Sequence, residues 1–128
     1  MIKALVTSMV VLLLAGLPAQ TVSAEDEASP TLYVVVECMQ SKNAGYEALV
    51  TGTWKPMHQH LVDGGKRNSW ALYRVLYGDR SRCDYYTVTT LIGDAQLNAT
   101  IDYAEVFAAV HPGKNVGKAM QATLAARH

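Results

Sequence analysis

The sequence predicts a small α+β domain in which a strand, a helix, two strands and two further helices follow one another. Three patterns lead to this prediction: a run rich in β-branched residues at 32–39, a helical stripe of apolar residues over 46–62, and alternating apolar residues at 69–77 and 84–92. Such an order is most of the split βαβ arrangement. With 128 residues, half of them apolar, the chain is long enough for one hydrophobic core.

The segment before the first strand has the pattern of a secretory signal peptide. Lys3 gives a positive start, residues 4–17 are mostly apolar, and the small residues Val22-Ser23-Ala24 precede an acidic stretch. An uncleaved membrane anchor is the alternative, but an apolar run of 14 residues is shorter than the ~20 that span a bilayer. We therefore expect release into the periplasm or the medium, with no membrane attachment. The expected division is a signal peptide at 1–24, a flexible segment at 25–31 and a single α+β domain at 32–128.

The residue pattern also predicts details of the first strand and the first helix. Residues 32–39 are so uniformly apolar that they predict a central strand with neighbours on both sides. The helix over 46–62 contains Pro56, which removes a backbone donor, so it should kink or restart near Trp54. Gly64-Gly65 then ends it by allowing a left-handed residue.

The segments 69–77 and 84–92 are predicted to form a hairpin across a charged turn. One face of the resulting sheet should pack on the helices. The other carries Ala71, Tyr73 and Val75, and an apolar face of this kind usually marks an interface. We therefore expect a two-fold homodimer joined sheet to sheet.

Two helices are predicted after the hairpin. Asp102 and Glu105 have capping-box spacing, so a helix should start there and continue to Val110 before Pro112-Gly113. Asn115 can cap a last helix, whose apolar stripe is expected at Val116, Met120, Thr123 and Leu124.

Charge and spacing argue against two kinds of partner. The 11 basic and 11 acidic side chains balance, so the chain has no electrostatic footprint for nucleic acid. His58 and His60 point to different sides of a helix and there is no acidic cluster, so we expect no metal site. Lys66-Arg67 is assigned to a solvated turn.

Cys38 and Cys83 are the only cysteines. Two buried thiols that never meet are one possibility. In the split βαβ arrangement, however, the first and third strands are antiparallel neighbours, and Cys38 closes the first while Cys83 opens the third. Since export supplies an oxidising compartment, we predict a structural disulfide between them.

Four segments carry a resemblance to a known group: Trp54-Lys55-Pro56-Met57-His58-Gln59, Gly64-Gly65-Lys66, Trp70-Ala71-Leu72-Tyr73 and Cys83-Asp84-Tyr85-Tyr86-Thr87-Val88-Thr89. Over roughly 32–127 the chain resembles small secreted bacterial proteins of unknown function, which are similar to dimeric α+β barrels of the ferredoxin-like superfamily. The resemblance implies a ferredoxin-like homodimer with a pocket between sheet and helices. Such domains finish with a fourth strand, and we expect this chain to lack it and to leave one edge of the first strand open.

The candidate pocket residues are Trp54, His58, Trp70, Tyr73, Arg74 and Tyr85. Trp54 and His58 are four apart on one helix face, where they either orient a ligand or form an edge of the core. Arg74 alternates with Trp70 on one strand face, so it meets either an anionic ligand or a carboxylate of Glu37 or Asp84. The tyrosines line a cavity or a subunit interface, or else pack in the sheet.

The sequence shows no recognisable catalytic set, which favours a non-catalytic binding or structural module. The superfamily's small monooxygenases make the alternative a cofactor-independent monooxygenase or isomerase acting on an aromatic or apolar molecule. No cofactor is expected. The expected partners are a second copy of the chain and a small apolar or aromatic ligand.

Overall fold

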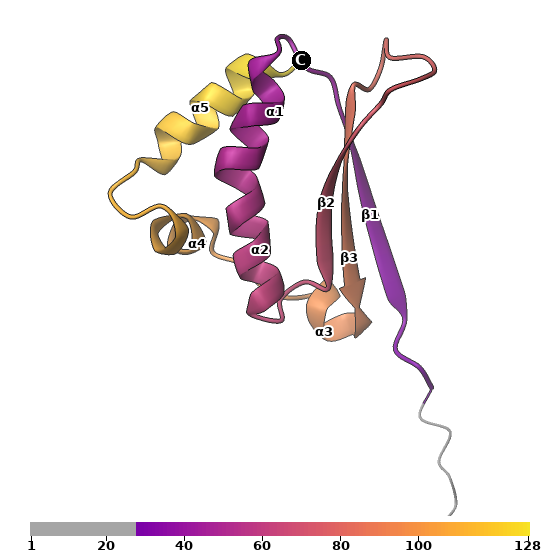
Figure 1. The fold of residues 1–128 in the computed structure, drawn as a ribbon. Helices are drawn as coiled ribbons and strands as arrows, with labels where there is room; N and C mark the ends of the chain where they lie inside the picture. Colours follow the sequence, from indigo (N-terminus) through magenta and orange to yellow (C-terminus); the bar gives the residue numbers. More distant parts are fainter. Residues whose placement is uncertain (1–27) are drawn as a thin grey trace, which may run out of the picture.

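A computed structural model describes residues 28–128 as a three-stranded antiparallel sheet with helices against one face (Figure 1). The strands are β1 (Leu32–Met39), β2 (Ser69–Arg74) and β3 (Tyr85–Ile92), in the order β1-β3-β2. This confirms the α+β class and the expected pairing of the first and third strands. The predicted signal peptide and the start of the segment after it lie outside the described residues.

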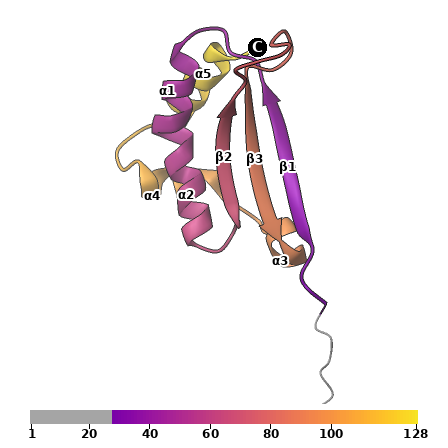
Figure 2. The same cartoon turned by 45° about the vertical axis from the view of Figure 1, so that its right-hand side comes forward.

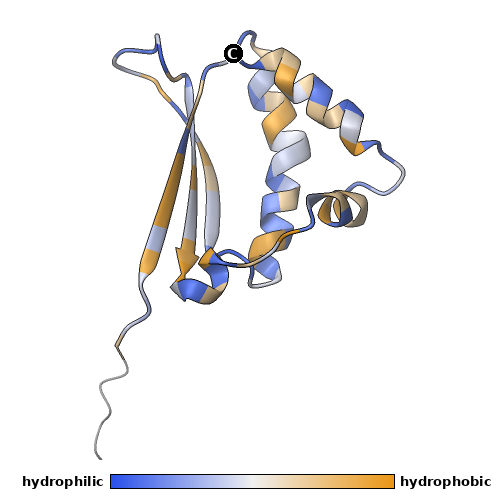
Figure 3. Ribbon diagram, turned by 180° about the vertical axis from the view of Figure 1, so that it is seen from behind, coloured by the Kyte–Doolittle hydropathy of each residue, from blue (hydrophilic) through white to orange (hydrophobic). Residues whose placement is uncertain are grey.

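Side-chain alternation gives the sheet an inner face toward the helices and an outer face without them. Along β3, Tyr85, Thr87 and Thr89 are buried on the inner face. On the outer face the exposed large apolar side chains include Leu32, Val34, Val36, Tyr73, Tyr86 and Ile92. Figure 3 shows the hydrophobic colouring that runs along β1.

Strand β1 is an edge strand in the described part of the chain, which agrees with the expected open edge, although its uniform apolarity by itself predicted a central strand. Among residues 28–128 it pairs only with β3, from Leu32 opposite Ile92 to Met39 opposite Tyr85. The helices lie nearest β2, so β1 is poorly covered (Figure 2). The uniformly apolar run correctly predicted a strand. The same pattern occurs in a central strand and in an edge strand whose apolar side chains are exposed, so it does not predict the position of the strand in the sheet.

The chain end returns to the top of β1. Ser41 forms an isolated antiparallel bridge with Arg127, and the His128 amide donates to the Gln40 carbonyl at 2.9 Å. This contact joins the end of the last helix to the segment that directly follows β1.

The first helical segment is continuous but contains one wide turn. Helix α1 (Gly45–Leu49) passes through a π-helical turn (Val50–Trp54) into α2 (Lys55–Asp63). The interruption near Trp54 was predicted from Pro56, and it takes the form of a π turn, a usual way of fitting an irregularity into a helix. Gly65 has a φ of 70° and ends the segment as expected.

The core forms between this helical segment, the inner face of the sheet and the last helix. The predicted stripe is confirmed, because Tyr46, Val50, Met57 and Leu61 are all buried. Tyr46 packs against Tyr85 with 5.2 Å between ring centroids.

The second strand is shorter than predicted. It ends at Arg74, and Leu76 and Tyr77 are 65% and 92% exposed in the loop that leads to β3. The third strand begins at Tyr85, so Cys83 lies just before β3 instead of opening it. The predicted disulfide is nevertheless present, with the Cα atoms of Cys38 and Cys83 5.4 Å apart.

Three helices follow β3: α3 (Gly93–Leu97), α4 (Tyr103–Val110) and α5 (Val116–Ala126). Helix α3 was not predicted. Asn115 caps α5 as expected, but the expected stripe is partly wrong, since Met120 and Leu124 are 44% and 52% exposed. Thr123 and Ala126 are the buried positions, because α5 meets α1 at its far end. No helix within residues 28–128 is long and apolar enough to cross a membrane.

We expect Asp102→Ala to lower the free energy of unfolding by about 1 kcal/mol, the usual cost of losing an N-cap. The Asp102 carboxylate accepts hydrogen bonds from the amides of Ala104 and Glu105, both at 3.0 Å, and Ala leaves both donors without this partner. Urea denaturation would measure the change. Asp102→Asn should retain most of the stability, and an equal loss in both variants would contradict the capping role.

Candidate functional site

The structure contains a cavity of about 400 Å³ between the inner face of the sheet and the helices. Every strand contributes to its lining, as do the first helical segment, α3, α5 and the loop before α4. Its walls are mainly apolar and aromatic, including Val35, Trp70, Leu91, Leu97, Ile101 and Met120. Size and lining are those of a small-molecule site.

Three of the predicted site residues line this cavity: Trp54, His58 and Trp70. The His58 ring stacks on the Trp70 indole, with 4.4 Å between centroids and 11° between planes. Trp54 instead donates its indole N–H to the Thr123 hydroxyl at 2.7 Å, which joins the π turn to α5. The two residues four apart on the helix therefore have separate partners.

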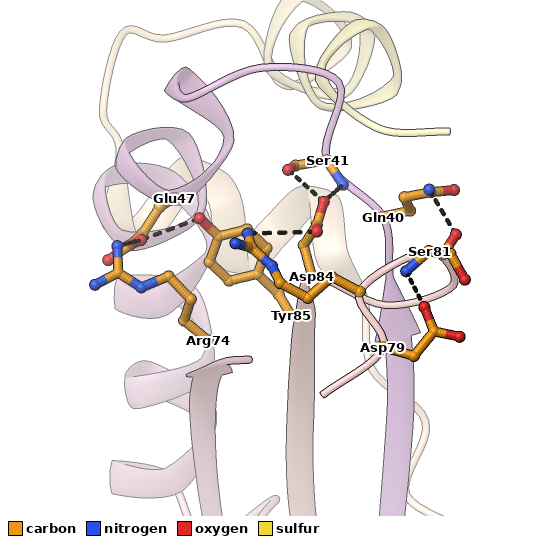
Figure 4. Close-up of polar contacts among 9 residues, drawn as sticks. Gln40, Ser41, Glu47, Arg74, Asp79, Ser81, Asp84 and Tyr85 are labelled. Atoms are coloured by element: carbon orange, nitrogen blue, oxygen red, sulfur yellow. Dashed lines mark hydrogen bonds and ion pairs between the residues drawn. The ribbon is translucent and has the colours of Figure 1, made fainter. Parts of the chain in front are cut away.

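The other three predicted residues lie elsewhere. Tyr73 is on the outer face of the sheet and 57% exposed, because it alternates with Trp70 and Arg74 along β2. Arg74 and the Tyr85 hydroxyl both contact the Glu47 carboxylate, at 3.3 and 3.1 Å (Figure 4).

The expected partners of Arg74 were wrong. Glu37 is two strands away and accepts from the Thr87 hydroxyl at 2.9 Å, and Asp84 pairs with Arg80 at 3.5 Å. Arg74 meets Glu47 because α1 crosses this end of the inner face, a placement that strand alternation cannot predict.

Arg67 is one of several cavity residues that sequence reasoning missed, as are the charged Glu37 and Arg127. It was assigned to a solvated turn, but it is half-buried and lines the cavity. Its guanidinium donates from Nη1 to His58 Nδ1 at 2.7 Å and from Nη2 to the Tyr103 hydroxyl at 2.6 Å. Tyr103 is 36 positions away, so no local pattern signals this contact.

The environment of His58 keeps its ring neutral. Burial, and to a smaller extent the positive charge of Arg67, together lower the pKa of His58 to about 4. A guanidinium can only donate, so Nδ1 must be the acceptor and the ring proton must sit on Nε2. His58 thus presents an Nε2–H donor at neutral pH.

The His58 pKa makes stability depend on pH. The unfolded chain binds a proton near the ordinary histidine pKa of about 6.5, whereas the folded chain binds it only near 4, so stability should fall as pH drops through this window. Allowing for partial solvent screening, we expect a loss on the order of 1–2 kcal/mol. Urea denaturation at pH 7 and pH 4.5 would measure it. His58→Gln should flatten the dependence, and His60→Gln, at an exposed position, should not; equal slopes in all three proteins would contradict the assignment.

The cavity therefore combines apolar and aromatic lining residues with a polar cluster of Arg67, His58 and Tyr103, and it also has two charged residues, Glu37 and Arg127. Such an arrangement can enclose a small molecule and orient one polar end of it.

Among residues 28–128, no three His, Cys, Asp or Glu side chains lie close enough together to hold a metal ion. Comparisons of the chain with protein-family models, curated proteins and solved structures gave no match.

Proposed function

We propose that the protein is an exported, non-catalytic binding module that holds a small apolar or aromatic molecule between its sheet and its helices. The observation that carries this proposal is the cavity of about 400 Å³ with mainly apolar and aromatic walls. A ligand would be held mostly by burial of its apolar surface, and a few polar groups would set its orientation.

Export is supported by two independent features. Residues 1–24 have the signal-peptide pattern, and Cys38 and Cys83 form a disulfide, which persists in oxidising compartments. Mass spectrometry of the protein recovered from the periplasm should give a chain that begins at Glu25. An intact Met1 held in the membrane would contradict export.

A homodimer of the dimeric α+β barrel type is the assembly we propose. The strand residues of the outer face carry no charged side chain, and six of its large apolar residues are exposed: Leu32, Val34, Val36, Tyr73, Tyr86 and Ile92. A patch of this kind is rarely left in contact with water. A second copy can cover it by self-complementary packing about a two-fold axis.

Substitutions at two neighbouring valines test ligand binding and dimer formation separately. Val35 lines the cavity and Val34 lies on the outer face, and both are partly exposed, at 43% and 56%. We expect Val35→Arg to abolish saturable binding of the neutral fluorophore N-phenyl-1-naphthylamine while the dimer remains. Val34→Arg should do the reverse, with binding retained and a monomer in light scattering.

These experiments can refute each part of the proposal. Wild-type protein that does not bind the fluorophore would refute the binding function, and a wild-type monomer at all concentrations would refute the dimer. Turnover of a molecule recovered from the purified protein would favour the monooxygenase or isomerase alternative.

A further inference from the structure

Arg67 is a cation of the cavity wall with no anionic partner in the described residues. The ion pairs within 28–128 are Arg74 with Glu47 and Arg80 with Asp84, and no carboxylate lies within 4.0 Å of Arg67. Its two side-chain partners, His58 and Tyr103, are neutral acceptors. A half-buried guanidinium is usually matched by a carboxylate or a phosphate, which it binds more strongly than a neutral group.

The hydrogen bonds around Arg67 leave a surplus of donors. His58 Nδ1 and the Tyr103 oxygen both accept from the guanidinium. The groups that remain free to form hydrogen bonds are therefore donors: the His58 Nε2–H, the Tyr103 O–H and the other guanidinium N–H groups. The His58 Nε2–H has no partner among residues 28–128. A cluster of donors around a positive charge is complementary to an anion.

The rest of the cavity indicates what carries that anion. Trp70 stacks on His58, and Leu97 and Ile101 line the same cavity. Glu37 lies on β1, the edge strand opposite the one that carries Trp70. Thr89 of the central strand pairs with both Val35 and Trp70, and Glu37 is two residues beyond Val35. A second cation, Arg127, also lines the cavity on that side, where its guanidinium contacts the sulfur of Met39 at 3.7 Å. The charges of Glu37 and Arg127 offset each other there, so the anionic end of a ligand is expected at Arg67.

We propose that the cavity binds an apolar molecule with a single carboxylate, and that Arg67, with Tyr103 and His58 beside it, holds this carboxylate. The inference rests on the proposed binding function and names the ligand class for that same site. An aromatic acid and a fatty acid share the required chemistry.

A competition experiment with full-length mature protein tests the inference. N-phenyl-1-naphthylamine is displaced in turn by 2-naphthoate, by the neutral 2-naphthalenemethanol, by decanoate and by decanol. We expect at least one of the acids to compete about tenfold or more better than its matched alcohol. Preference for naphthoate would identify an aromatic acid, and preference for decanoate a fatty acid.

Variants assign that preference to Arg67. In Arg67→Gln the acid-to-alcohol ratio should fall to about one, and in Arg67→Lys part of the preference should return. Lys66→Gln removes a neighbouring exposed cation outside the cavity and should keep the full ratio. Circular dichroism would show that each variant is folded.

The outcomes separate the two proposals. If the fluorophore does not bind, the binding function itself fails. If it binds but acids and alcohols compete equally in the wild-type protein, or if Lys66→Gln loses the preference as fully as Arg67→Gln, the carboxylate site is refuted while the binding function stands.

Discussion

Replacing both disulfide cysteines, by Cys38→Ser with Cys83→Ser, is expected to lower the free energy of unfolding by about 3–4 kcal/mol. The bridge spans 45 positions, and closing a loop of that size removes this much chain entropy from the unfolded state. It also ties β1, the poorly covered edge strand, to the segment that leads into β3. The free energy of unfolding lost with the bridge should therefore be a large fraction of the total for so small a protein.

Urea denaturation of the wild-type and doubly substituted proteins would measure this effect. Reduction of the wild-type disulfide should cause a similar loss, which controls for the effect of the serines themselves. Denatured, unreduced wild-type protein should contain no reactive thiol. Two reactive thiols per chain, or a double variant as stable as the wild type, would contradict the structural role of the bridge.

Tyr46→Ala should be the most damaging single substitution in the core, with a loss of about 3–5 kcal/mol. Tyr46 is 1% exposed and packs in one cluster with Val50, Tyr85 and Ala126. Truncation would leave a void where the helical segment, the sheet and α5 meet. Thermal and urea unfolding would both detect the change.

Tyr46→Phe is the matched control. The Tyr46 hydroxyl has no side-chain hydrogen bond in the described residues, although burial raises the pKa of this side chain. The Phe variant should therefore stay within about 1 kcal/mol of the wild type. Equal losses in the two variants would show that the hydroxyl, and not the ring, holds this position.

The features that the sequence predicted well are set by residues close together in the chain. The cap at Asn115, the helix end at Gly65 and the interruption near Trp54 each depend on a few neighbouring residues. The position of β1 depends on distant elements: its apolar pattern predicted a strand with two neighbours, and the open edge was expected only because a fourth strand was expected to be lacking.

The candidate site divides in the same way. Trp54 and His58 could be predicted as cavity residues because helical periodicity places them on one face. Arg67 could not, because its position depends on contacts with a residue of the preceding helix and with Tyr103 at the start of α4. Tyr73 shows a different error: strand alternation correctly placed it on the face away from the helices, so it should not have been named as a pocket residue as well.

The π-helical turn at Val50–Trp54 makes the first helical segment sensitive to chain length. In a regular α-helix, Leu61 would be rotated by roughly 60° from Tyr46, and both side chains are buried in the structure. The wide turn changes this angle to roughly −40°, because one turn contains an extra residue. Deleting one residue there would restore an ordinary helix and swing Trp54 and His58 relative to Tyr46. A one-residue deletion or insertion at this turn would therefore reshape the cavity wall while the strands keep their pairing.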